Sequence, residues 1–214
     1  RRCRSGILYT LGQLSDEGHV YAEREQLVQA ACTLLEADAA PVCEALERMI
    51  LSEELITERE AIYLPAFYHA ECGAARRLKE LAESAGRTLF TTELDPGVLT
   101  AETGIDYDDV QLAAIRQAVT SKVMVLTGGP GTGKTTTTQG IIAALKKAGL
   151  RVLLAAPTGR AAKRMSEATG MDAKTIHRLL EYNPQDGYKR GDENPLDGDA
   201  LIVDECSMID ILLM

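Results

Sequence analysis

The sequence has no apolar run long enough to cross a bilayer, and it does not open with a secretory signal pattern. It also has no internal repeat and no C-x-x-C pair among its five cysteines. An odd number of scattered cysteines builds neither a disulfide scaffold nor a zinc site, so we expect a protein of the reducing cytoplasm with no membrane partner. The 214 residues are 45% hydrophobic and 26% charged, which is typical of a globular chain holding one large domain or two small ones.

The net charge of −9 argues at first against a nucleic-acid partner. Binding to nucleic acid depends on local positive patches, however, and not on net charge. Basic residues gather in short clusters at 1–4, 76–79, 160–164, 174–178 and 189–190. Solvated helix faces explain each cluster equally well, so charge alone leaves the choice open.

Residues 1–66 are expected to form a small, mostly α, winged-helix-like module. Apolar residues at helical spacing predict three helices, at 6–12, 24–36 and 38–51. Two short apolar runs at 55–57 and 61–64 predict the strands of a hairpin. Three helices followed by a hairpin describe a winged helix, a fold that binds nucleic acid or serves as a protein-contact module. The expected recognition helix carries Arg48 beside Glu44 and Glu47, which favours a structural or interaction role.

Residues 67–104 are expected to connect this module to the rest of the chain as a helical linker. A polar helix is predicted over 66–85, and Gly86 is expected to end it because glycine commonly follows the last helical turn. The chain through Pro96 and Gly97 is expected to be a loop, since both residue types mark turns.

The region 105–214 is predicted to be an α/β domain, a RecA-like P-loop lobe with a parallel sheet. It opens with a helix over 106–119 that turns its apolar side inward, through Val110, Ala114, Ile115 and Ala118. Apolar strands then alternate with helices, which indicates a parallel sheet covered on both faces. The expected strands are 123–127, 152–156 and 200–203, and the expected helices are 134–148, 159–169 and 175–181. Residues 182–198 are rich in Gly, Pro, Asn and Asp and are expected to be a long exposed loop.

Residues 128–135 read Gly-Gly-Pro-Gly-Thr-Gly-Lys-Thr, which fits the pattern G-x-x-x-x-G-K-[ST]. Glycines let successive backbone N–H groups point at a phosphate chain, and the following helix adds its positive N-terminal dipole. Lys134 is expected to reach the β- and γ-phosphates of ATP, and the Thr135 hydroxyl is expected to coordinate Mg²⁺. The predicted ATP-binding residues of this segment are Gly128, Gly129, Pro130, Gly131, Thr132, Gly133, Lys134, Thr135 and Thr136.

Asp204 and Glu205 follow the expected strand that ends at Val203. A carboxylate at the carboxyl end of a parallel strand faces the crevice in which ligands bind. Asp204 is predicted to hold Mg²⁺, and Glu205 is predicted to accept a proton from the attacking water. The predicted catalytic set is therefore Lys134, Asp204 and Glu205, and two adjacent acids favour hydrolysis over phosphoryl transfer to a small molecule.

Four segments in sequence order resemble successive motifs of superfamily 1 helicases, most closely the RecD/TraA group of the exodeoxyribonuclease V alpha-subunit type. They are the phosphate-binding loop and the segments 156–165, 175–180 and 203–208. The resemblance covers 105–214 directly and implies the first motor lobe of an ATP-dependent DNA helicase. It further implies 5′-to-3′ movement on single-stranded DNA in repair and recombination. Other repair proteins are expected partners of the winged-helix-like module.

The resemblance also assigns roles to single residues. Gln111 matches the glutamine that reads the adenine edge in this superfamily, and its amide can both donate and accept. The implied contacts to single-stranded DNA are Pro157, Thr158, Gly159 and Arg160, followed by Thr175 and His177. Taken alone, an exposed glutamine or histidine on a helix is more often an ordinary surface residue.

The resemblance further predicts a second lobe, whose arginine stabilises charge on the γ-phosphate. A chain that stops at Met214 is expected to be a piece of a longer protein that binds ATP, hydrolyses it poorly and does not unwind DNA. Two other interpretations remain open. A small-molecule kinase with a P-loop would not respond to single-stranded DNA, and a degenerate motor that acts as a scaffold would tolerate Glu205→Gln.

Overall fold

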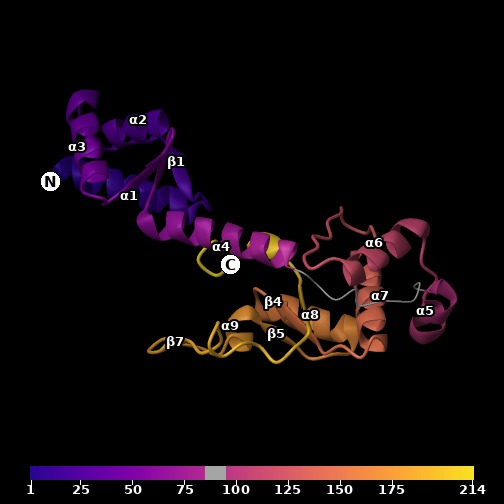
Figure 1. Cartoon of the computed structure of the whole chain (residues 1–214). Helices are drawn as coiled ribbons and strands as arrows, with labels where there is room; N and C mark the ends of the chain where they lie inside the picture. Colours follow the sequence, from indigo (N-terminus) through magenta and orange to yellow (C-terminus); the bar gives the residue numbers. More distant parts are fainter. Residues whose placement is uncertain (85–94) are drawn as a thin grey trace. The chain divides into compact units, whose positions relative to one another are not determined.

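The computed structural model describes residues 1–84 and 95–214 and divides into two compact units (Figure 1). The first unit is Arg1–Leu78 with Asp210–Met214, and the second is Lys79–Ile209. No helix among the described residues is long and apolar enough to cross a membrane. The expected helix end at Gly86 lies outside the described residues.

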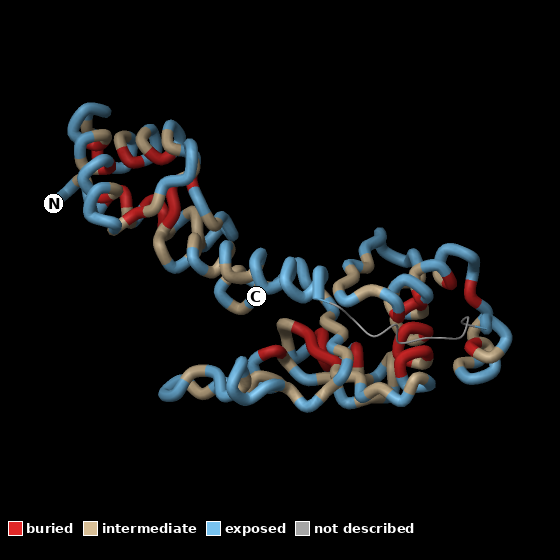
Figure 2. The backbone as a smooth tube through the Cα atoms, in the orientation of Figure 1, coloured by how far each residue is buried: buried red, intermediate tan, exposed pale blue. Residues whose placement is uncertain are grey.

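Three helices build the core of the first unit: α1 (Arg2–Asp16), α2 (Arg24–Leu35) and α3 (Ala39–Leu51). Each helix packs against the other two, and their buried stretches face one another (Figure 2). The side chains that are fully buried between them and the neighbouring strands include Ile7, Leu27, Val42, Leu46, Leu55 and Ile62. The predicted helices are confirmed, because their apolar residues repeat at the helical period and find a common core.

A three-stranded antiparallel sheet completes this unit. Its strands are β1 (Tyr21–Glu23), β2 (Ile56–Glu58) and β3 (Ala61–Tyr63), in the order β1-β3-β2. The predicted hairpin is confirmed in β2 and β3, which turn through Arg59 at a φ of 56°. β1 was not predicted from sequence, since its three residues are too few to show an alternating pattern.

Two helices follow in the chain. α4 (Pro65–Glu83) is the expected polar helix and has no buried residue. α5 (Pro96–Thr103) lies where a loop was expected through Pro96 and Gly97, so that expectation was wrong. Asp95 accepts a hydrogen bond from the Gly97 N–H at 2.9 Å, and proline is well tolerated in a first helical turn because its missing N–H has no partner there.

The second unit contains a parallel sheet with strand order β5-β4-β8, which confirms the α/β class. The strands are β4 (Val152–Ala156), β5 (Ala173–Thr175) and β8 (Ala200–Val203). The helices are α6 (Asp109–Thr120), α7 (Lys134–Lys147), α8 (Gly159–Thr169) and the short α9 (Ile176–Leu179), and a 3-10 turn, η1, covers Cys206–Met208. Ile142, Leu154 and Met165 form a buried cluster that joins α7 and α8 to β4.

Polar contacts fix the amino ends of β4 and β8 to each other. The Arg151 N–H donates to the Asp199 carboxylate at 2.7 Å, and the Asp199 N–H donates to the Arg151 carbonyl at 2.8 Å. The Arg151 guanidinium also pairs with Asp197. This reciprocal arrangement sets the register Val152↔Ala200 at the start of the parallel pair.

Three expectations for the second unit were wrong. The segment 123–127 forms no strand, and Val125 is 84% exposed, because none of the described strands pairs with it. The expected inward side of α6 was wrong in part. Ile115 is buried and Ala118 packs against the same core as expected, but Val110 is 79% exposed in the first turn, and Leu112 and Val119 are buried instead. The expected loop 182–198 contains a small hairpin of β6 (Tyr182–Asn183) and β7 (Gly187–Tyr188). Residues 184–186 form its turn, in which the Gln185 N–H donates to the Asn183 side chain at 3.1 Å.

Candidate nucleotide-binding and nucleic-acid site

The glycine-rich segment 128–133 forms the loop that leads into α7. Gly131 and Gly133 have φ values of 74° and 79°, which side-chain-bearing residues rarely adopt, and Gly133 is the N-cap of the helix. A Cβ at Gly128 would lie 2.7 Å from the Thr132 hydroxyl, which itself donates to the Gly129 carbonyl at 2.9 Å. The loop therefore needs glycine at these positions for steric reasons.

Lys134 closes the loop with its side chain. Its ammonium donates to the carbonyl of Gly128 at 2.6 Å and to the carbonyl of Gly129 at 2.7 Å. The charge thus lies within the curve of the backbone, beside the first turn of α7. Thr135 follows on that turn and is exposed.

α7 is held firmly under the loop by its contact with α6. A Cβ at Gly140 would lie 2.4 Å from the Ile115 Cδ1 atom and 3.0 Å from the Tyr107 ring, so glycine lets the two helices approach closely. Ile141, Ala144 and Leu145 are buried on the same helix. The loop is thereby attached to a packed core although its own residues are mostly exposed.

Gln111 lies directly against the loop. Its backbone N–H donates to the Asp108 carboxylate at 2.8 Å, and its side-chain carbonyl accepts from the Asp108 N–H at 3.1 Å, which forms a capping box at the start of α6. The Nε2 atom is 2.5 Å from the position that a Cβ at Gly133 would occupy. The structure therefore brings together two residues that sequence reasoning assigned to one nucleotide site.

The carboxyl ends of the three parallel strands bring the other predicted residues to one edge of the sheet. Pro157 and Thr158 follow β4, Thr175 ends β5, and Asp204 follows β8. The Asp204 N–H still donates to the Ala155 carbonyl of β4 at 3.0 Å. This edge is where ligands bind in open parallel sheets.

Both predicted DNA-contacting threonines begin a helix. The Thr158 hydroxyl accepts from the Ala161 N–H at 3.2 Å at the start of α8, and the Thr175 hydroxyl accepts from the Arg178 N–H at 3.2 Å. Gly159 and Arg160 occupy the exposed first turn of α8. An oxyanion near α8 would meet backbone N–H groups and the positive end of the helix dipole.

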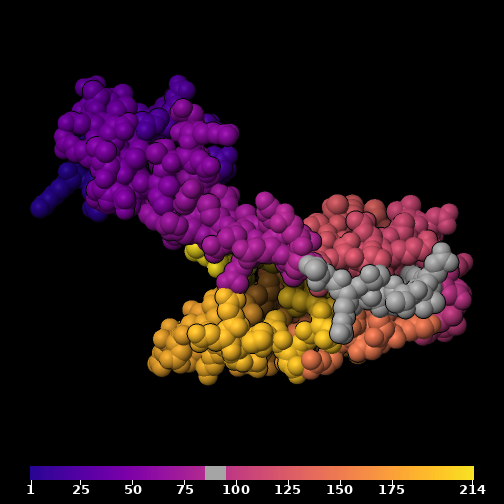
Figure 3. Space-filling view, viewed as in Figure 1, coloured from indigo at the N-terminus to yellow at the C-terminus, as the bar shows by residue number. Residues whose placement is uncertain are grey.

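His177 belongs to an aromatic cluster that sequence reasoning missed. Its ring centroid lies 5.5 Å from that of Tyr182 and 6.1 Å from that of Tyr188, and the two tyrosine rings are 4.8 Å apart. Tyr182 and Tyr188 remain 45% and 42% exposed on the β6–β7 hairpin. This hairpin lies at one end of the second unit (Figures 1 and 3). The only signal in the sequence is a pair of tyrosines close to Lys189 and Arg190.

The two acids after β8 have different surroundings. Asp204 accepts a hydrogen bond from the Glu205 N–H at 2.9 Å, and burial together with the charge of Asp204 raises the pKa of the Cys206 thiol. Glu205 adopts a left-handed backbone with a φ of 55°, and its carboxylate accepts from the Arg164 guanidinium at 3.1 Å. No hydrogen bond or ion pair among residues 1–84 and 95–214 joins the glycine-rich loop to either acid.

Thr135 and Asp204 offer a hydroxyl and a carboxylate oxygen, and hard oxygen donors are what Mg²⁺ prefers. Magnesium is commonly held by one or two such side chains together with phosphate oxygens and water. The donor set of this chain therefore fits the ion that the sequence predicts.

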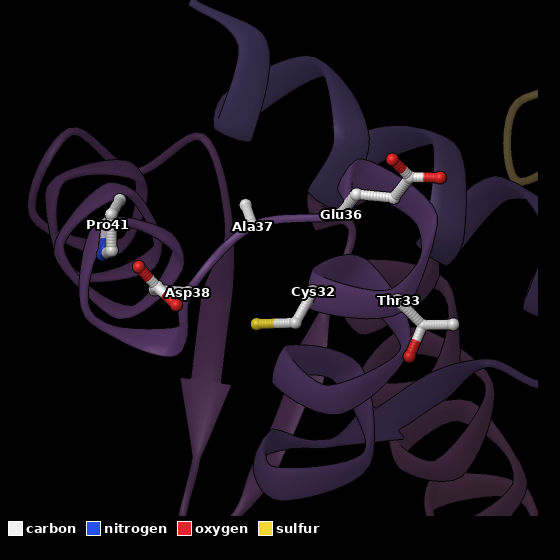
Figure 4. A pocket seen from close by; sticks show the side chains of 6 residues that line it. All are labelled: Cys32, Thr33, Glu36, Ala37, Asp38 and Pro41. Carbon is white, nitrogen blue, oxygen red and sulfur yellow. The ribbon is translucent and has the colours of Figure 1, made fainter.

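The first unit has an open surface depression between the end of α2 and the start of α3 (Figure 4). It is lined by Cys32, Thr33, Glu36, Ala37, Asp38 and Pro41. None of the residues predicted from the sequence to bind nucleotide or DNA lines it.

A glycine-rich loop that cradles a lysine ammonium at the start of a helix, in a unit with a parallel sheet, defines a P-loop nucleotide-binding domain. A family model described as an AAA domain matches residues 111–214. The ATP-dependent RecD2 DNA helicase of Deinococcus radiodurans is 39% identical over 172 residues, which are 78% of this chain and 23% of that protein.

Subunits of the RecBCD enzyme are also similar to this chain. RecD of Mycolicibacterium smegmatis is 39% identical over 129 residues, covering 49% of this chain and 23% of the relative, and RecD of Haemophilus influenzae is 37% identical over 131 residues, covering 50% and 20%. These matches support the assignment of this chain to the RecD type of superfamily 1 helicases. It spans between 20% and 23% of the length of these relatives.

Proposed function

We propose that this chain is the ATP-binding lobe of a cytoplasmic DNA helicase that couples ATP hydrolysis to 5′-to-3′ movement on single-stranded DNA during repair and recombination. The observation that supports this most is the position of the Lys134 ammonium inside the 128–133 loop, with Gln111 packed against Gly133. The relatives named as a DNA helicase and as RecBCD subunits also support the proposal. The direction of movement comes from the family resemblance.

ATP would take the place that the loop geometry prepares for it. Lys134 would exchange its two carbonyl partners for β- and γ-phosphate oxygens, and Gln111 would present its amide to the adenine. Thr135 and Asp204 would hold Mg²⁺, which when bound offsets the negative charge of the phosphates. Glu205 would accept a proton from the water that attacks the γ-phosphate.

Single-stranded DNA would bind along the carboxyl edge of the sheet. Pro157, Thr158, Gly159 and Arg160 supply a helix N-terminus and a guanidinium for phosphate groups, and Thr175 and His177 extend this surface along β5 and α9. The exposed rings of Tyr182 and Tyr188 beside His177 support the assignment, because unpaired bases stack on aromatic side chains.

The region 1–66 would be a winged-helix-like module, joined by the helical linker 67–104 to the motor lobe 105–214. The three helices and the β1-β3-β2 sheet support this assignment. The charge pairing on α3 favours a contact with other repair proteins over one with DNA. Arg48 pairs with Glu44, and Glu47 pairs with Arg24 at 2.5 Å, so the helix has no basic face for phosphate groups.

The decisive experiment measures ATP hydrolysis by the longest form of the protein that contains residues 1–214, with and without single-stranded DNA, beside Lys134→Ala. We expect DNA to raise the rate of the wild-type protein and Lys134→Ala to lower the rate strongly. Equal rates in all three samples would contradict the proposal, and hydrolysis indifferent to DNA would favour a small-molecule kinase. Residues 1–214 alone are expected to hydrolyse ATP slowly and not to unwind DNA, because an arginine from a second lobe contributes about 10³–10⁵ in rate.

A further inference from the structure

Glu205, the predicted acceptor of the water's proton, is held by one contact that the sequence motifs do not explain. Its carboxylate Oε1 accepts a hydrogen bond from the Arg164 Nη2 atom at 3.1 Å, across 41 positions in the sequence. A carboxylate oxygen that accepts from a guanidinium is directed toward α8. While it accepts from the guanidinium, this oxygen is engaged in an ion pair and is not free to accept a proton from a water molecule.

The backbone of Glu205 leaves only its side chain free to change this arrangement. Its N–H donates to the Asp204 carboxylate at 2.9 Å, and its carbonyl accepts from the Met208 N–H at 3.0 Å. The residue adopts φ 55° and ψ 40°, a strained conformation that both hydrogen bonds maintain. A change of partner at Glu205 is thus a rotation of the side chain over a fixed backbone.

Arg164 stands on a helix whose position is equally fixed. Ala161, Ala162 and Met165 bury one face of α8 against β4 and its neighbours. Arg160 and Arg164 are four residues apart and so lie on one exposed face, a single turn from each other. A DNA phosphate bound at Arg160 would consequently lie within reach of the Arg164 guanidinium.

The pair is exposed enough to be broken by such a phosphate. The side chains of Arg164 and Glu205 are 62% and 38% exposed, and ion pairs in such surroundings contribute little net stability. A phosphate offers the planar guanidinium a bidentate partner that a single carboxylate oxygen at 3.1 Å does not. The competing partner therefore needs only a modest advantage to take Arg164 away from Glu205.

We propose that Arg164 is a positioning residue that keeps the Glu205 carboxylate engaged in this ion pair until a phosphate of single-stranded DNA binds its guanidinium. The released carboxylate then accepts the proton of the water while the water oxygen bonds to the γ-phosphorus and the bond to the bridging oxygen of ADP breaks. This rests on the proposed function, and it explains how DNA on the α8 surface would accelerate hydrolysis at the end of β8.

The test compares wild type, Arg164→Ala, Arg164→Lys and Lys163→Ala in the longest form of the protein that contains this chain. ATP turnover is measured over a range of ATP concentrations, with and without oligo-dT. Lys163 is the matched control, because it lies on the same helix and pairs with Glu167 at 3.8 Å instead of Glu205. Thermal melts verify that each variant is folded.

We expect Arg164→Ala to raise the DNA-independent kcat by about threefold to fivefold, the range that loss of an exposed ion pair allows. The KM for ATP should not change, and the stimulation by oligo-dT should fall by the same factor. Arg164→Lys should restore most of the repression, and Lys163→Ala should leave the DNA-independent kcat as in wild type.

A DNA-independent kcat of Arg164→Ala equal to or below that of the wild type overturns the inference while leaving the proposed function intact, provided that oligo-dT still stimulates the wild type. Should Arg164→Ala not fold, a DNA-independent kcat of Arg164→Lys below that of the wild type counts against it in the same way. A wild-type protein whose hydrolysis ignores oligo-dT overturns both.

Discussion

The two units of this chain use their residues differently. In the first, Ile7, Leu27 and Leu46 have no exposed surface and pack into one continuous core. In the second, the predicted site residues lie outside the buried core, such as the half-buried Lys134 on its loop carbonyls and Glu205 with a φ of 55°. Substitutions in the first unit should therefore affect stability most where side chains are buried. Substitutions in the second unit should affect activity most at residues outside the core.

The largest effect is expected at a half-buried position of the second unit. Lys134→Ala should lower the DNA-stimulated kcat by about 10²–10³-fold, a loss of about 3–4 kcal/mol in transition-state stabilisation, because a positioned positive charge is removed. The melting temperature should stay within about 2 °C of the wild type, since the hydrogen bonds of this side chain go to carbonyls of the loop and not to the core. A large loss of stability would mean that the loop contributes to the core. It would contradict the view that the site residues of the second unit contribute little to its stability.

The converse experiment removes a buried side chain from the first unit. Leu46→Ala should lower its free energy of unfolding by about 2–5 kcal/mol, because Leu46 is fully buried between the helices. Urea unfolding followed by circular dichroism measures this loss, and fluorescent ATP binding should be unaffected. An equal change in nucleotide affinity would show that the units are energetically coupled.

A pair of glycine substitutions separates close packing from helix propensity. Gly140→Ala should cost about 1–3 kcal/mol, since its Cβ would lie 2.4 Å from Ile115 Cδ1. Gly12→Ala, on a helix of the first unit with no atom within 4 Å of the new Cβ, should stabilise by about 0.5–1 kcal/mol. Denaturation midpoints of the two variants should therefore move in opposite directions.

The smallest effect concerns pH and the first unit. Burial, with Glu71 as the next cause, raises the pKa of Tyr63 from 10.0 to about 12. The folded state thus holds the phenolic proton more tightly, so this contribution to stability is complete below about pH 10 and is lost as the pH rises toward about 12. Thermal midpoints at about pH 9 and about pH 11 should differ less for Tyr63→Phe than for the wild type, while the exposed Tyr9→Phe should behave as the wild type does.

The sequence predicts well those features that depend on residues close together in the chain. The glycine-rich loop and the amphipathic helices of the first unit depend on contacts or conformations within a few positions of each other, and all of them are found. The strand expected at 123–127 depends on a hydrogen-bonded neighbour, which an apolar run cannot guarantee. The ion pair of Arg164 with Glu205 joins residues 41 positions apart, so no local sequence pattern predicts it. α5 was missed because proline is a loop signal and also a good first residue of a helix.

The reciprocal contacts of Arg151 with Asp199 have a consequence at the opposite end of the strands. Side chains alternate between the faces of a sheet, so a slip of β8 by one residue along β4 would send each of its side chains to the other face. Asp204 would then point to the other side of the sheet, where its carboxylate could not serve the proposed Mg²⁺ site. The Arg151–Asp199 contacts at the amino ends of the two strands thus determine on which face of the sheet the acids at the carboxyl ends lie. Weakening these contacts would displace the acids even though no acid is itself substituted.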